Sequence, residues 1–321
     1  MTKDYAVGID IGGTNTKFGI VDRKGNILEQ GRMRTDAHEN AEDFIEDLFV
    51  NLSKLITSHG GKEKFKGIGV GAPNGNYYTG TIEYAPNLKW KGIIPMAELI
   101  EKKFELPTKL TNDANAAAMG EMMYGVAKGL KHFITITLGT GVGSGIVIDG
   151  KIVVGHDGFA GELGHVIVKP GGRLHKGTGM RGSLESYASA TGVRETAIEF
   201  LTDEPNTASL LRNYSIDDLT SETVYNCAIQ GDVIANKIFE FTGEVLGEAL
   251  ANFVMFSSPE AIVLFGGLTK AGDLILKPTV QAMEANLLPI FKNKVKVIFS
   301  DLKEADAAIL GASALVWESE H

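Results

Sequence analysis

Short apolar runs separated by tight polar turns open the chain. Residues 5–10 (YAVGID) and 17–21 (KFGIV) read as buried strands, and a third strand pattern starts at Ile27. The connecting turns, IGGTNT and DRKGN, are rich in Gly, Asn and Asp, which favour hairpin turns. The pattern therefore predicts a three-stranded meander. Residues 41–58 then place apolar side chains three and four positions apart, which predicts an amphipathic helix.

The same order recurs in the second half of the chain, where residues 133–138 (FITITL) predict a strand and GTGVGS a turn. The other predicted strands are residues 67–71, 145–148, 151–154, 262–265 and 295–299, and the other predicted helices are residues 112–124, 193–201, 222–230, 233–256 and 305–317. Two similar units of this kind predict an α/β protein with two lobes and a central cleft. The predicted small lobe covers residues 1–120 with a returning C-terminal helix (305–321), and the predicted large lobe covers residues 121–304.

Composition narrows the class of protein. The 321 residues are 44% hydrophobic and 22% charged, as is ordinary for a globular protein, and the formal net charge is -9. An acidic chain is not expected to bind nucleic acid through a broad basic surface. Cys227 is the only cysteine, so no intramolecular disulfide can form. Neither a secretory signal nor an apolar stretch of membrane-spanning length is evident, so we expect a cytoplasmic protein that binds no membrane.

The glycines gather in short clusters that suggest phosphate binding. No P-loop string occurs, and GTGVGSG is followed by a strand pattern rather than a helix, which argues against a dinucleotide-binding fingerprint. Two glycine-rich hairpins can instead bring bare backbone close to a polyphosphate. The candidates are Asp10, Gly12, Gly13, Thr14, Asn15 and Lys17 in the first turn, and Gly139, Thr140, Gly141 and Gly143 in the second. Asp10 is the candidate ligand for Mg²⁺, directly or through water. The alternative is that both turns are merely tight hairpins.

Several longer segments carry a family resemblance. They are DIGGTNTKFGIVD, GAPNGNYYTGTIEYAPNLKW, TNDANAAAMGE, TLGTGVGSGIVIDGKI, GELGHVIV, GMRGSLESYASATG, IVLFGGL and DAAILGAS, in that order. Together they resemble the ROK family (repressor, open reading frame, kinase) of the actin/hexokinase superfamily over nearly the whole chain. The resemblance implies the two-lobed actin-like (ribonuclease H-like) ATPase fold. It also implies ATP and Mg²⁺ as cofactors, a small-molecule hexose as substrate and a homo-oligomer, specifically a dimer.

The resemblance also implies site residues. Asp113 matches the family's catalytic base, and the other candidate hexose ligands are Asn87, Asn112, Glu162, His165 and Glu185. Gly266 and Gly267 resemble the family's adenosine turn. Two structural alternatives remain open: Asn112 or Asp113 could only cap a helix, and the two glycines could only precede one.

One departure concerns metal binding. The family usually carries three zinc-binding cysteines just before the residue that matches Glu185, and here these positions are Lys176, Thr178 and Ser183. Zinc prefers Cys and His ligands, and His165 with His175 supplies only two nitrogens. We therefore expect no structural zinc.

Four functions are compatible with these patterns. The segment LESYASATG resembles glucokinase-type members, so phosphorylation of glucose to glucose 6-phosphate leads. An N-acylhexosamine kinase, acting on N-acetylmannosamine or N-acetylglucosamine, is the alternative, and a fructose or allose kinase comes third. A sugar-sensing regulator without a DNA-binding domain is the non-enzyme alternative; the presence of both Asp10 and Asp113 argues against it.

Overall fold

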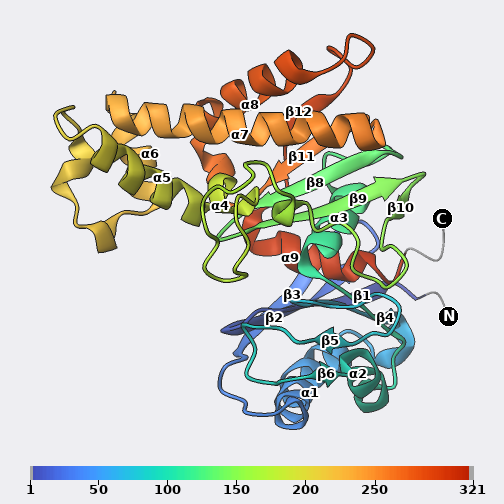
Figure 1. The fold of residues 1–321 in the computed structure, drawn as a ribbon. Coiled ribbons are helices and arrows are strands. Elements are labelled where there is room, and N and C mark those ends of the chain that lie inside the picture. The colour runs from blue at the N-terminus through green and yellow to red at the C-terminus, as the bar shows by residue number, and fades with distance from the viewer. Residues whose placement is uncertain (1–2, 318–321) are drawn as a thin grey trace. The chain divides into compact units, whose positions relative to one another are not determined.

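The computed structural model describes residues 3–317, apart from the side chains of residues 304 and 305 (Figure 1). The chain divides into two compact units. Within the described range, unit 1 comprises residues 3–131, 145–161 and 300–317, and unit 2 comprises residues 132–144 and 162–299.

Unit 1 is built on a five-stranded sheet of order β3-β2-β1-β4-β7. Its strands are β1 (Tyr5–Ile11), β2 (Asn15–Asp22), β3 (Ile27–Arg34), β4 (Phe65–Gly71) and β7 (Thr108–Thr111). Strands β1, β2 and β3 pair antiparallel, which confirms the predicted meander, whereas β4 pairs in parallel with both β1 and β7. Parallel neighbours need a crossover connection, and helices supply it here.

Helices cover both faces of this sheet. Helix α1 (Ala41–Ser58) and helix α2 (Met96–Phe104) pack on one face, where Phe44, Leu48 and Leu52 of α1 are completely buried (Figure 1). Helix α3 (Asp113–Tyr124) and helix α9 (Glu304–Ala314) pack on the other. Helix α9 approaches the strands so closely that a Cβ atom on Gly8 or Gly69 would overlap its backbone carbonyls. Short strands β5 (Ile82–Glu83) and β6 (Ile93–Ile94) and the 3₁₀ turn η1 (Lys62–Lys64) complete unit 1.

The second sheet has the order β10-β9-β8-β11-β12. Its strands are β8 (Phe133–Leu138), β9 (Val142–Ile148), β10 (Lys151–Ile152), β11 (Ala261–Phe265) and β12 (Lys296–Phe299). In unit 2, β11 pairs in parallel with both β8 and β12. The chain passes from unit 2 to unit 1 within β9, between Ser144 and Gly145.

Unit 2 carries most of the helices of the second half of the chain. They are α4 (Glu185–Ala188), α5 (Ala190–Asp203), α6 (Ser221–Ala228), α7 (Val233–Ser257) and α8 (Asp273–Asn286), with the 3₁₀ turns η2 (Leu163–His165), η3 (Leu210–Asn213), η4 (Ile216–Asp218) and η5 (Gly267–Ala271). Helices α7 and α8 lie side by side (Figure 1), and α7 presents Gly243 and Gly247 to Pro278 and Thr279. The sequence pattern missed α8, because Pro278 lies inside it and proline normally ends a helix.

The compact units differ from the predicted lobe ranges in three segments. Residues 121–131, 145–161 and 300–304 belong to unit 1. The reason is local packing: α3 continues to Tyr124, and Gly145 lies so close to Ala114 and Ala118 of α3 that a Cβ atom there would overlap them. No helix among the described residues is long and apolar enough to cross a membrane.

Candidate functional site

The first glycine turn joins β1 to β2 in unit 1. The Gly12 N–H donates to the Asn15 carbonyl (3.0 Å), which closes the turn. A Cβ atom on Gly13 would lie 2.7 Å from the Asn87 carbonyl oxygen, so only glycine allows Asn87 to come this close. Thr14, Asn15 and Lys17 are exposed. Unit 1 therefore brings the predicted phosphate turn and the candidate hexose ligand Asn87 together.

The candidate base stands at the start of α3. Asn112 caps the helix, because its side chain accepts a hydrogen bond from the Asn115 N–H (2.7 Å). Asp113 is the first helical residue, and its Oδ1 accepts from the Ala114 N–H (2.9 Å). The capping role considered for Asn112 is thus present. The Asp113 side chain is exposed to solvent, so it stays available for the predicted role of catalytic base.

The pKa values of both Asp10 and Asp113 are raised, and the charge of Asp113 contributes to the shift of Asp10. Burial and the negative charge of Asp113 raise the pKa of Asp10 to about 6, although Lys17, its partner across the β1–β2 ladder, acts in the opposite direction. Removal of water by the surrounding protein also raises the pKa of Asp113, whereas the hydrogen bond from the Ala114 N–H acts in the opposite direction. Two carboxylates in one neighbourhood resist joint ionisation, and such shifts are common at functional sites.

The Asp10–Asp113 pair is also relevant to the predicted binding of Mg²⁺. Mg²⁺ is usually held by one or two carboxylates together with waters and substrate phosphates. A single cation beside Asp10 would favour its ionised form against the burial and the charge of Asp113 that raise its pKa, so Asp10 fits the role predicted for it. Among the described residues, no group of three or more His, Cys, Asp or Glu side chains is arranged to hold a metal. The expectation of no structural zinc stays a prediction.

The second glycine turn joins β8 to β9 in unit 2. The Gly139 N–H donates to the Gly141 carbonyl (3.0 Å), and the Gly143 N–H donates to the Thr137 hydroxyl (3.1 Å). The start of α5 holds the turn from the side, since the Thr191 hydroxyl donates to the Thr140 carbonyl (2.9 Å). These hydrogen bonds fix the backbone of the second glycine turn. The fixed backbone is compatible with a hairpin that receives a ligand and equally with a plain tight turn.

The Gly266-Gly267 turn lies at the adjacent strand end. Strands β8 and β11 are parallel, with Phe265 opposite Thr137. A Cβ atom on Gly266, whose φ is 107°, would lie 2.7 Å from the Leu138 carbonyl oxygen. The structure therefore places both glycine turns of unit 2 at the carboxyl ends of neighbouring strands, where α/β proteins commonly bind ligands.

Three candidate hexose ligands gather around the start of β9. The Val142 N–H donates to Glu185 Oε2 (2.7 Å), and a Cβ atom on Gly164 would overlap the Val142 carbonyl. The GELGH segment that contains Gly164 carries Glu162 and His165, and His165 Nε2 lies 3.9 Å from Glu162 Oε2. His165 Nδ1 is buried and has no hydrogen-bond partner among the described residues. An unpaired buried nitrogen of this kind is suited to a polar ligand or a water.

The loop before Glu185 is a hairpin held by hydrogen bonds. The His175 N–H donates to the Met180 carbonyl (2.8 Å), and Leu174 forms an isolated antiparallel bridge with Arg181. Of the three positions where the family carries cysteines, Ser183 is buried against the Ser186 hydroxyl (2.8 Å), Thr178 contacts His175 (2.8 Å), and Lys176 is exposed.

Two residues of this loop were missed as site candidates. Arg173 donates to Glu199 and to the Ser186 carbonyl, and its guanidinium lies 4.6 Å from the Tyr187 ring centroid. His175 Nε2 lies 3.0 Å from Glu185 Oε1. The only signal in the sequence was their place in a glycine-rich loop before Glu185, and nothing in the pattern specifies the side chains that they reach.

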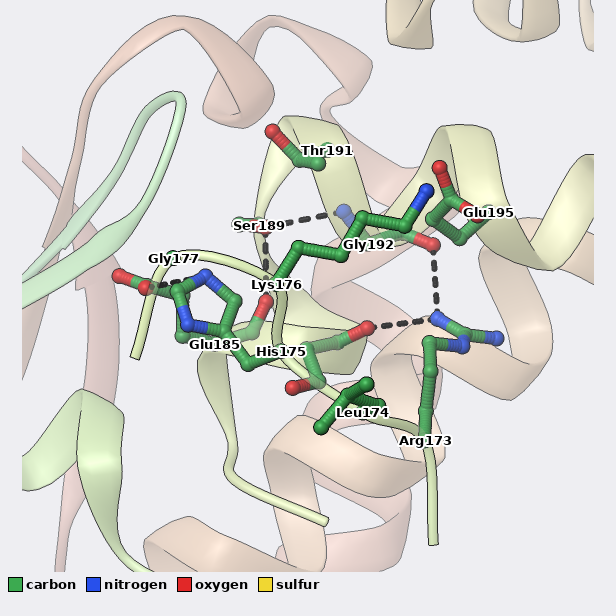
Figure 2. Close-up of a pocket in the computed structure, with 11 residues that line it drawn as sticks. Arg173, Leu174, His175, Lys176, Gly177, Glu185, Ser189, Thr191, Gly192 and Glu195 are labelled. Carbon is green, nitrogen blue, oxygen red and sulfur yellow. Dashed lines mark hydrogen bonds and ion pairs between the residues drawn. The ribbon is translucent and has the colours of Figure 1, made fainter. Parts of the chain in front are cut away.

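These residues line a pocket of about 160 Å³ inside unit 2 (Figure 2). Its lining residues are Arg173, Leu174, His175, Lys176, Gly177, Glu185, Ser186, Ser189, Thr191, Gly192 and Glu195. Figure 2 shows the His175 ring beside Glu185, and Thr191 and Glu195 on the helix behind them. Carboxylate, imidazole, hydroxyl and ammonium groups together give this part of unit 2 both donors and acceptors for a polar ligand.

Comparisons with known proteins show the family of this chain. The model of the ROK family matches residues 6–319. The glucokinase of Halalkalibacterium halodurans is 36% identical over 100% of this chain and 97% of its own, and that of Thermotoga maritima is 31% identical over 99% of each. A crystal structure of a ROK family glucokinase from Streptomyces griseus in complex with glucose and AMPPNP aligns with a TM-score of 0.78 at 32% identity, covering 97% of this chain and 98% of that one.

The predicted fold class is therefore confirmed: the α/β architecture is that of the actin-like ATPase fold. The family match spans both units, and the relatives are aligned over nearly their full length. The chain belongs to the ROK family.

Proposed function

We propose that this protein is an ATP-dependent hexokinase that phosphorylates glucose to glucose 6-phosphate. Relatives named glucokinase that are 31% and 36% identical over full length support the reaction. The observation in the structure that carries the proposal is the Asp10–Asp113 pair of unit 1, with a raised pKa at both carboxyls. ATP is the proposed donor, and the glucokinase of S. griseus, solved with AMPPNP, supports that assignment.

Asp113 is the proposed base. It would accept the proton of the attacking hexose hydroxyl as that oxygen forms its bond to the γ-phosphorus of ATP, while the bond from the γ-phosphorus to the bridging oxygen breaks and ADP leaves. Phosphoryl transfer depends mainly on positioning and charge neutralisation, so a base needs to act only late. The raised pKa of Asp113 brings it closer to working pH, which favours proton acceptance.

The other candidate residues would bind and orient the reactants. In unit 1, Asp10 would hold Mg²⁺, which supplies charge neutralisation at the phosphates when it is bound. The glycine turns of the two units would offer backbone N–H groups to the phosphates, and Gly266-Gly267 would lie beside the adenosine. Asn87 and Asn112 in unit 1, and Glu162, His165 and Glu185 in unit 2, would hydrogen-bond the hexose hydroxyls.

An ADP-release assay over a panel of sugars tests the proposal. The panel should contain glucose, mannose, fructose, allose, N-acetylglucosamine and N-acetylmannosamine. We expect the highest kcat/KM with glucose, and Asp113→Asn should lower kcat at least about a hundredfold because a positioned acid–base group typically contributes that much. A preference for an N-acylhexosamine would establish the alternative kinase, and Asp113→Asn with kcat within tenfold of the parent would refute the assigned base.

Three further expectations belong with this proposal. We propose a cytoplasmic protein that assembles as a dimer and binds neither nucleic acid nor membrane. The net charge of -9 supports the lack of a nucleic-acid surface. Sedimentation velocity would measure the oligomeric state, and a monomer at micromolar concentration would contradict the dimer.

A further inference from the structure

Both carboxylate oxygens of Glu185 are held by protein groups. Oε2 accepts the Val142 N–H at 2.7 Å, and Oε1 lies 3.0 Å from His175 Nε2. The Glu185 side chain is only 14% exposed, so water competes little for these bonds. A carboxylate held at both oxygens keeps one orientation, because rotation would break at least one charge-assisted hydrogen bond.

The His175 ring is itself held on its other nitrogen. Nδ1 lies 2.8 Å from the Thr178 hydroxyl oxygen, which already accepts the Met180 N–H at 3.3 Å. The Thr178 proton is therefore available for Nδ1, which leaves the imidazole proton on Nε2 to be donated to Glu185. This arrangement gives every polar group of the chain Met180–Thr178–His175–Glu185 a hydrogen-bond partner.

The backbone around His175 is fixed independently of this chain. The His175 N–H donates to the Met180 carbonyl, and the Gly179 N–H donates to the His175 carbonyl, both at 2.8 Å. Arg173, two residues before His175, donates to the Ser186 carbonyl (2.6 Å), which connects the loop to the helix that begins at Glu185. Loss of the His175 ring should thus leave the loop in place while freeing Oε1 of Glu185.

We propose that His175 is a positioning residue that, with Thr178, holds Glu185 in the orientation in which it receives hexose hydroxyl groups. An ionised carboxylate has about four lone-pair sites, and Val142 and His175 occupy two, so two remain for hydroxyl donors. The role rests on the proposed function of Glu185 as a hexose ligand. In this proposal, hydrogen bonds hold the loop in which the family usually carries zinc-binding cysteines.

Four variants test the proposal. His175→Ala removes the donor, His175→Gln keeps an N–H donor of similar reach, Thr178→Val removes the hydroxyl, and Glu185→Ala removes the carboxylate. His156→Ala, at an exposed histidine of unit 1, is the matched control. Each protein is assayed for kcat, for the KM of glucose and for the KM of ATP, and its melting temperature is measured. The ¹⁵N shifts of the imidazole nitrogens in the ligand-free protein report the tautomer.

We expect His175→Ala to raise the KM of glucose about tenfold, the loss typical of a hydrogen bond to a charged group, while the KM of ATP stays within twofold. His175→Gln should recover most of the loss, and Thr178→Val should fall between the two. In the parent protein, the ¹⁵N shifts at pH 8 should show the proton on Nε2, and Thr178→Val should weaken that preference.

Other outcomes would overturn the proposal. If His175→Ala and His175→Gln lower the melting temperature equally and raise both KM values, His175 only holds the loop together. If Glu185→Ala raises the KM of glucose but His175→Ala does not, His175 plays no positioning role. If Glu185→Ala itself leaves that KM unchanged, the proposed hexose role of Glu185 is wrong, and the role of His175 fails with it, whereas the ¹⁵N result would still measure the hydrogen-bonded chain.

Discussion

Replacement of Asp10 by Asn should stabilise the ligand-free protein at neutral pH while impairing its function. The structure raises the pKa of Asp10 to about 6 from 3.8, mainly through burial and then through the charge of Asp113. A raised carboxyl pKa means that the folded state holds its proton more tightly than the unfolded state does. The ionised carboxylate therefore costs folding free energy, and this cost appears as pH rises from about 4 to about 6.

The size of the effect follows from the shift. Two pKa units correspond to about 3 kcal/mol, since one unit is worth about 1.4 kcal/mol. Below pH 4 the carboxyl is protonated in both states, so Asp10→Asn should there have the same stability as the parent. Above pH 6 the variant should be more stable by up to about 3 kcal/mol, an upper value because local relaxation lowers the cost of burying the charge.

Urea denaturation followed by tryptophan fluorescence is the assay. Both tryptophans, Trp90 and Trp317, lie in unit 1 with Asp10, so the signal reports the unit in which the change is made. Asp36→Asn is the matched control, because Arg34 lowers the pKa of Asp36 and its removal should bring no gain. Equal stability of Asp10→Asn and the parent at pH 8, or a difference that grows below pH 4, would refute the reasoning.

Three shorter predictions concern metals and packing. Activity should need a divalent cation, should disappear with EDTA and should return with Mg²⁺, and full activity in metal-free buffer would contradict the role of Asp10. Elemental analysis after dialysis against a chelator should find far less than one zinc per chain, since Lys176 and Thr178 are poor zinc ligands; about one zinc would disprove this expectation. Gly69→Ala should destabilise the protein by about 1–3 kcal/mol in the same urea assay, because its Cβ atom would overlap the Ala312 carbonyl, and unchanged stability would disprove the close packing of α9.

Much of unit 1 and the strand pattern of unit 2 could be predicted because their signals are local. Apolar runs and short Gly/Asn/Asp turns specify a meander with little help from the rest of the chain. The helix cap formed by Asn112 likewise depends only on residues close to it in the sequence. Helix α8 was missed since local rules weigh against a helix around Pro278, and its packing against α7 outweighs them.

Candidate residues such as Asp10, Asp113 and Glu185 could be identified from motifs in the sequence, and their roles stay predictions. Their pKa values and hydrogen-bond partners could not be predicted from those motifs. The raised pKa of Asp10 depends first on its burial and then on a carboxylate 103 positions away, and both arise only when β1 and α3 pack in one unit. The hydrogen bond from His175 to Glu185 depends on how a hairpin loop folds back on a helix start. Sequence by itself determined the glycine turns, most of the strands and the family. Tertiary structure decided which charges and donors meet, because electrostatic and hydrogen-bond energies depend on distances in space rather than along the chain.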